Sequence, residues 1–133
     1  SRRLADTYAA ASIGDGVDFS IPLVAPRSGS RFGGRVFVLV NRRSFSNSVF
    51  VAAIIQDYGF GRVLGEPTSD LATTYGAAEQ FTLPHTGLSV SFPKAFIVRP
   101  SGDARVQGVI PDHAIETPLV ISADDPVLEK RFV

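Results

Sequence analysis

Two apolar stretches in the middle of the chain have the lengths and patterns of a strand followed by a helix. Residues 35–40 form a short continuous apolar run, which predicts a strand covered on both faces, as in a parallel sheet. Residues 47–58 predict a helix, and its centre, VFVAAII, is apolar nearly all round, so the helix should be deeply buried. Gly59 follows at the C′ position. Residues 62–64 begin a second strand, so the pattern predicts a β-α-β unit.

The segments before and after this unit have weaker patterns. Residues 2–11 predict a short helix, and residues 18–24 predict a strand in which Pro22 favours an edge position. A long polar loop is expected over residues 65–78. Two strands are expected after it, around Gln80–Leu83 and Leu88–Phe92, joined by a Pro-His-Thr-Gly turn.

The C-terminal part of the sequence alternates apolar and turn segments. Residues 94–99, KAFIVR, form another short run that is apolar between its terminal lysine and arginine. Residues 108–112 form a tight Pro-Asp element. Near the end, Asp124 or Asp125 followed by Pro126 predicts the start of another helix. Together these patterns predict an α/β fold, with residues 1–133 as one domain.

Composition excludes several classes of function. The formal net charge is zero, with a pI near 6.7, which argues against a nucleic-acid partner. No apolar run has the length of a transmembrane segment. The absence of cysteine excludes a thiol nucleophile, and two isolated histidines predict no metal site. No phosphate-binding loop is recognisable, so no cofactor is expected. The chain starts without methionine, which predicts a longer parent protein.

Three serines crowd the junction between the central strand and the helix, at Ser44, Ser46 and Ser48. One interpretation is that they cap the helix. The other is that one of them is a nucleophile, because a helix N-terminus offers unpaired N–H groups and a positive dipole to a developing oxyanion. The local pattern leaves both interpretations open.

The segment VFVLVNRRSFSNSVFVAAIIQDYGFGRVLGEPTSD resembles the core of the C-terminal processing, or tail-specific, serine peptidases. The resemblance rests on Ser-Phe-Ser-Asn-Ser, Gln-Asp-Tyr-Gly and Gly-Glu-Pro-Thr, and continues through FTLPHTGLSVSF to GVIPD. It implies a crotonase/ClpP-like layered sheet with a β-α-β core and an additional β-rich C-terminal part. It further implies the C-terminal portion of a peptidase catalytic domain, a peptide or protein substrate, and a periplasmic or secreted location. Oligomeric state is not predicted.

The resemblance also assigns residues to roles. The family's nucleophile falls on Ser46, and the backbone N–H of Asn47 follows as one oxyanion donor. A second donor is expected from outside this chain. Loops after parallel strands line ligand sites in α/β folds, so we expect the loop after the second strand to line the cleft. The alternative is that its polar residues only form turns. The candidate cleft-lining residues are Glu66, Thr68, Asp70, Thr74 and Tyr75.

The general base is the point at which this sequence departs from the family pattern. The lysine of the tail-specific branch would stand at Leu71. Lys94, His85 and His113 are each better explained as surface residues, so a base outside this chain is expected. Asp57 at the helix end is expected to have a structural role. A second function therefore stays open, a non-catalytic module that binds a peptide or a hydrophobic ligand.

Overall fold

The computed structural model describes residues 2–116, which form two compact units that divide between Gly33 and Gly34. The first unit contains helix α1 (Arg2–Ala10), which confirms the predicted N-terminal helix. The predicted strand over residues 18–24 is wrong, because the segment has no strand structure and Leu23 and Val24 are 87% and 89% exposed. A strand needs a partner strand for its backbone hydrogen bonds, and none pairs with this segment within residues 2–116.

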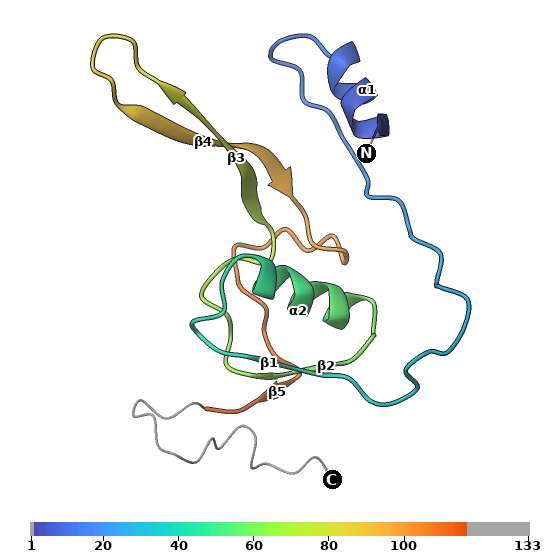
Figure 1. Cartoon of the computed structure of the whole chain (residues 1–133). Helices are drawn as coiled ribbons and strands as arrows, with labels where there is room; N and C mark the ends of the chain where they lie inside the picture. Colours follow the sequence, from blue (N-terminus) through green and yellow to red (C-terminus); the bar gives the residue numbers. More distant parts are fainter. Residues whose placement is uncertain (1, 117–133) are drawn as a thin grey trace. The chain divides into compact units, whose positions relative to one another are not determined.

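A three-stranded parallel sheet forms the base of the second unit. Strand β2 (Arg62–Gly65) lies in the centre, between β1 (Phe37–Val40) and β5 (His113–Ala114). Val38 pairs with Val63, and Leu64 pairs with His113. The β-α-β unit predicted from the sequence is therefore confirmed, and β5 is an addition that the sequence did not predict (Figure 1).

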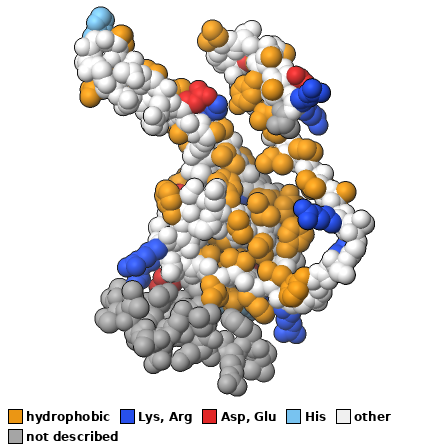
Figure 2. All heavy atoms as spheres, in the orientation of Figure 1, with side chains coloured by type: hydrophobic (Ala, Val, Ile, Leu, Met, Phe, Trp, Pro, Cys, Tyr) orange, Lys and Arg blue, Asp and Glu red, His pale blue; other side chains and the backbone are white. Residues whose placement is uncertain are grey.

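Helix α2 (Asn47–Asp57) covers one face of this sheet (Figure 1). Val49, Ala52 and Ala53 are fully buried, and they pack with Val40 and Val63 of the strands. The opposite side of the helix is open to solvent, where apolar side chains gather at the surface (Figure 2), among them Val51 at 51% and Ile54 at 39% exposure. The prediction of a helix buried all round is therefore wrong.

The second face of the sheet is also more open than expected. Phe37 and Leu39 alternate with the core residues of β1, and they are 36% and 42% exposed. Leu64 and Ile115 form a small buried cluster of their own. The prediction of a strand covered on both faces is wrong, because α2 packs on only one face of β1.

The C-terminus of α2 has the hydrogen bonds of a Schellman motif. The Gly59 N–H donates to the Gln56 carbonyl at 3.1 Å, and the Phe60 N–H donates to the Ile55 carbonyl at 2.9 Å. Gly59 has φ 67°, a value that glycine adopts without the steric cost other residues meet. The predicted C′ glycine is confirmed.

An antiparallel hairpin, β3 (Thr74–Thr82) and β4 (Ser89–Ile97), forms a separate two-stranded sheet in the second unit. The two expected strands are confirmed, but both are longer than predicted, and the supposed loop over residues 65–78 ends at Thr74. Aromatic contacts across the hairpin join Tyr75 to Phe96 and Phe81 to Phe92. The helix predicted near Asp124 lies outside the described residues. Neither helix within residues 2–116 has the length and apolar character of a membrane span.

Candidate active site

Ser46 lies at the sharp turn that leads from β1 into α2, as the N-cap residue of the helix. Its backbone has φ 54° and ψ −123°, an unusual conformation for a residue with a side chain. The residue is exposed, and its side chain makes no capping hydrogen bond to the helix. A serine on a strained strand-to-helix turn, with a hydroxyl that does not cap the helix, has the backbone geometry of a nucleophile elbow.

The two neighbouring serines have a different role from Ser46. The Ser44 hydroxyl oxygen accepts the Asn41 N–H at 3.1 Å. The Ser48 hydroxyl accepts the Phe45 N–H at 2.9 Å and donates to the Phe45 carbonyl at 2.8 Å. Both hydroxyls therefore satisfy the backbone of the segment that leads into the helix, and both stiffen the turn around Ser46.

The backbone N–H groups of Ser46 and Asn47 differ in whether they already have a hydrogen-bond acceptor. The Ser46 N–H donates to Asp70 Oδ2 at 2.7 Å. The Asn47 N–H makes no hydrogen bond within residues 2–116, and it lies in the first turn of α2. Unpaired N–H groups at a helix N-terminus stabilise negative charge, so the position of the Asn47 amide is compatible with the oxyanion role predicted for it.

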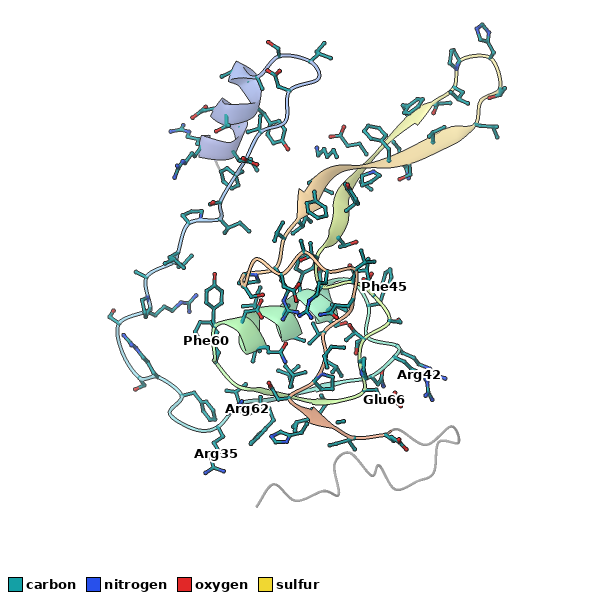
Figure 3. The ribbon with its side chains drawn as sticks, turned by 180° about the vertical axis from the view of Figure 1, so that it is seen from behind. Arg35, Arg42, Phe45, Phe60, Arg62 and Glu66 are labelled. Atoms are coloured by element: carbon teal, nitrogen blue, oxygen red, sulfur yellow. The ribbon has the colours of Figure 1, made fainter. Side chains whose placement is uncertain are left out.

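The carboxyl ends of β1 and β2 are joined beside the elbow by polar contacts (Figure 3). Glu66 accepts the Arg42 backbone N–H at 3.4 Å and pairs with the Arg42 guanidinium at 3.3 Å. Thr68 is 5% exposed, and its hydroxyl accepts the Val109 N–H and donates to the Asp70 carbonyl, each at 2.9 Å. Glu66, Thr68 and Asp70 thus form the frame of the loop behind Ser46, with Thr68 in the interior.

The other two residues expected to line the cleft belong to the hairpin. Thr74 begins β3, and the Tyr75 ring packs against Phe96 at a centroid distance of 4.9 Å. Within residues 2–116, no hydrogen bond joins either residue to Ser46. An aromatic residue that the sequence argument did not single out is nearer in the chain: Phe45, directly before Ser46, is 70% exposed.

The positions considered for a general base are Leu71, Lys94, His85 and His113. Leu71 stands where the family pattern has lysine, and its N–H donates to Asp70 Oδ1 at 2.9 Å. Lys94 forms an ion pair with Glu79 across the hairpin. His85 lies in the connection between β3 and β4, and His113 lies in β5. Within residues 2–116, no hydrogen bond joins His85 or His113 to Ser46.

A buried ion pair fixes the opposite end of α2. Arg99 donates to both carboxylate oxygens of Asp57, at 2.9 and 2.6 Å, and the two side chains are 7% and 6% exposed. Burial is the largest influence on the Asp57 carboxyl and favours its neutral form. Hydrogen bonds from Arg99 and Ser101, with the charge of Arg99, outweigh burial and hold the pKa of Asp57 below its ordinary 3.8. The structural role predicted for Asp57 therefore fits the geometry.

Two hollows of the second unit lie away from the elbow. One, of about 840 Å³, is bordered by Arg35, Phe60, Arg62 and His113, at the end of the sheet opposite to Arg42 and Glu66 (Figure 3). The other, of about 610 Å³, borders the Asp57–Arg99 pair. Neither includes Ser46. Within the part of the chain that the structure describes, no group of three potential ligands is placed to hold a metal ion.

Comparison with known proteins identifies one family. The model of peptidase family S41 matches residues 5–115, which covers most of the chain and includes the elbow, the loop behind it and the hairpin. A search of curated proteins returned no match.

Proposed function

Because the chain belongs to peptidase family S41, we propose that it carries the nucleophile of a serine endopeptidase of the carboxyl-terminal processing type, and that this nucleophile is Ser46. The observation that supports this role best is the conformation of Ser46, with φ 54° and no capping hydrogen bond. A serine that only capped the helix would use its hydroxyl for the first-turn N–H groups, at an ordinary φ. Strained backbone conformations persist where the surrounding structure holds them, and they cluster at active sites.

In the proposed reaction, the Ser46 hydroxyl oxygen attacks the carbonyl carbon of the peptide, and its proton passes to a general base. The carbonyl oxygen becomes an oxyanion, which accepts a hydrogen bond from the Asn47 N–H. When the intermediate collapses, the carbon–nitrogen bond breaks, the amine leaves with the proton, and an acyl-enzyme remains. Water then attacks the ester, releases the acid product and restores the hydroxyl.

The base and the second oxyanion donor are proposed to come from outside this chain. This part of the proposal rests on Leu71 at the lysine position and on the positions of the two histidines. A layered crotonase-like domain is proposed as the complete fold, with this chain as its C-terminal portion. A peptide or protein substrate and a periplasmic or secreted location complete the proposal.

One observation favours a second candidate function. Leucine cannot accept a proton, so Leu71 at the lysine position is also what a non-catalytic descendant of the family would show. Such a module would bind a peptide or a hydrophobic ligand at the same elbow without cleaving it.

Peptide hydrolysis by the full-length protein distinguishes the two functions. A library of fluorogenic peptides is incubated with the wild type, with Ser46→Ala and with Ser91→Ala, whose exposed serine lies on β4. Catalysis predicts that Ser46→Ala loses turnover by a factor of at least about 10³, while Ser91→Ala keeps the wild-type rate. Binding without turnover by a folded wild type, unchanged in Ser46→Ala, would establish the non-catalytic function.

A further inference from the structure

Resting on the proposed function, we propose that Asp70 is a positioning residue, which holds the strained elbow of Ser46 and directs the Asn47 N–H toward the reacting carbonyl. Asp70 lies 24 residues after Ser46 in the chain, in the loop that follows β2. Its role is to fix a backbone, and it does not exchange a proton with the substrate.

The contacts of the Asp70 carboxylate carry this inference. Oδ2 accepts the Ser46 N–H at 2.7 Å, and Oδ1 accepts the Leu71 N–H at 2.9 Å. Hydrogen bonds from backbone N–H groups to a carboxylate are charge-assisted, and they are about twice as strong as neutral ones. Oδ2 thus joins the loop to the elbow, while the bond to Oδ1 holds the carboxylate in place within its own loop.

The conformation of Ser46 needs such a restraint. A non-glycine residue in this region of backbone space is strained, and the strain persists only where neighbouring contacts over-determine it. On its C-terminal side, the Ser46 carbonyl accepts the Val49 N–H at 3.0 Å and the Phe50 N–H at 3.2 Å, so it is fixed by the helix. On its N-terminal side, the peptide plane entering Ser46 is held at both of its polar atoms. Its N–H donates to Asp70, and its carbonyl, from Phe45, accepts the Ser48 hydroxyl at 2.8 Å and the Ser48 N–H at 3.3 Å. Asp70 supplies the restraint that comes from outside the turn.

The bond to Asp70 also decides which amide faces the substrate. Because Asp70 occupies the Ser46 N–H, the adjacent Asn47 N–H is left as the donor at the helix N-terminus. Rotation of the elbow would release the Ser46 N–H and turn the Asn47 N–H away from the oxyanion. Small displacements of catalytic groups cost rates on the order of 10²-fold.

Asp70 is itself held from the interior. The buried Thr68 hydroxyl donates to the Asp70 carbonyl, and it accepts the Val109 N–H. The backbone at Gly108 approaches Thr68 so closely that a Cβ there would lie 2.1 Å from the Thr68 carbonyl oxygen. The carboxylate therefore stands on a rigid base, as a positioning residue requires.

Three substitutions at Asp70 separate position from charge. Asp70→Ala removes the acceptor, Asp70→Asn keeps an oxygen at the same reach without charge, and Asp70→Glu keeps the charge but moves the oxygens by one methylene. In the full-length protein, the rate of fluorophosphonate labelling is expected to fall about tenfold to a hundredfold in Asp70→Ala. Asp70→Asn is expected to stay within about fivefold of the wild type, and Asp70→Glu to fall between the two.

A kinetic and a structural measurement test whether Asp70 acts by positioning the Ser46 elbow. For peptide substrates, kcat is expected to fall in Asp70→Ala with KM nearly unchanged, since Asp70 makes no substrate contact in the proposal. Amide hydrogen exchange at Ser46 is expected to be slow in the wild type and fast in Asp70→Ala. Asp15→Ala is the matched control, because Asp15 also accepts one backbone N–H, from Ser12 at 2.9 Å, in the separate N-terminal unit.

The outcomes separate this inference from the proposal on which it rests. Labelling of the wild type that Ser46→Ala abolishes but Asp70→Ala leaves unchanged would overturn the role of Asp70 alone. A folded wild type that is not labelled would overturn both. If Asp70→Ala does not fold, the labelling rates of Asp70→Asn and Asp70→Glu decide between the alternatives. The positioning role predicts faster labelling of Asp70→Asn. Faster labelling of Asp70→Glu would overturn it, because charge would then matter more than position.

Discussion

Removing the Asp57 carboxylate is expected to destabilise the fold strongly, because it leaves the buried Arg99 guanidinium without its counterion. The carboxylate accepts two hydrogen bonds from Arg99 and one from the Ser101 N–H at 3.0 Å. In Asp57→Ala, the Gln56 side-chain oxygen, at 3.0 Å, is the remaining side-chain acceptor of Arg99 within residues 2–116. Breaking a buried pair by removing one partner costs about 3–5 kcal/mol, and we expect a loss in this range.

Urea unfolding followed by far-UV circular dichroism measures this loss as a lower midpoint at an unchanged m-value. The double variant Asp57→Ala/Arg99→Met removes the stranded charge as well, so we expect it to be more stable than Asp57→Ala. The control is Arg62→Ala, whose side chain is 67% exposed and lies 4.0 Å from Asp112, and its expected cost is below about 1 kcal/mol. A loss below about 1 kcal/mol in Asp57→Ala, or a double variant less stable than the single one, would refute the reasoning.

Three further predictions concern pH, the elbow and the loop. The pKa of Asp57 is lowered below 3.8 in the folded protein, so the stability that its carboxylate contributes is fully present above the unfolded pKa and is lost as pH falls through the folded value. The difference in free energy of unfolding between the wild type and Asp57→Asn should therefore narrow below about pH 3.8. Urea titrations from about pH 6 to about pH 2 measure this difference. Ser46→Gly should be more stable than Ser46→Ala by roughly 1–3 kcal/mol, because glycine adopts positive φ freely, and an equal Tm for the two variants would count against a strained elbow. Gly108→Ala should cost about 1–3 kcal/mol or more, since its Cβ would overlap the Thr68 carbonyl, and an unchanged thermal melt would contradict that contact.

Local pattern was enough to predict the β-α-β unit. A short apolar run, a helix-length apolar segment and a C′ glycine specify β1, α2 and Gly59 without reference to the rest of the chain. Burial was harder to predict, because apolar character shows which residues can be buried and not whether a partner covers them. Val51 and Leu39 are apolar and yet exposed.

Pairing between distant segments was beyond the sequence argument. Residues 74–78 look like a loop by composition, and they become part of β3 through their register with β4. Residues 18–24 look like a strand, but no strand in the described part of the chain pairs with them. The two-residue strand β5 has too little pattern of its own to be recognised, and it exists through its pairing with β2.

The candidate site also combines features that the sequence predicted with features that only the structure shows. The crowded serines and the family motifs drew attention to Ser46, while its backbone conformation could be seen only in the structure. Asp70 was expected near a cleft by its position after a strand. Its bond to the Ser46 N–H, across 24 residues, and the bonds between Arg99 and Asp57, across 42, depend on tertiary packing that no local pattern encodes.

The most direct test of the central claim is to locate the covalent adduct that a fluorophosphonate forms with the full-length protein. After labelling, proteolytic digestion and tandem mass spectrometry identify the modified residue. The account predicts one phosphonylated serine, Ser46, and no adduct in Ser46→Ala. An adduct on another serine, or none on a folded protein that cleaves peptides, would contradict it.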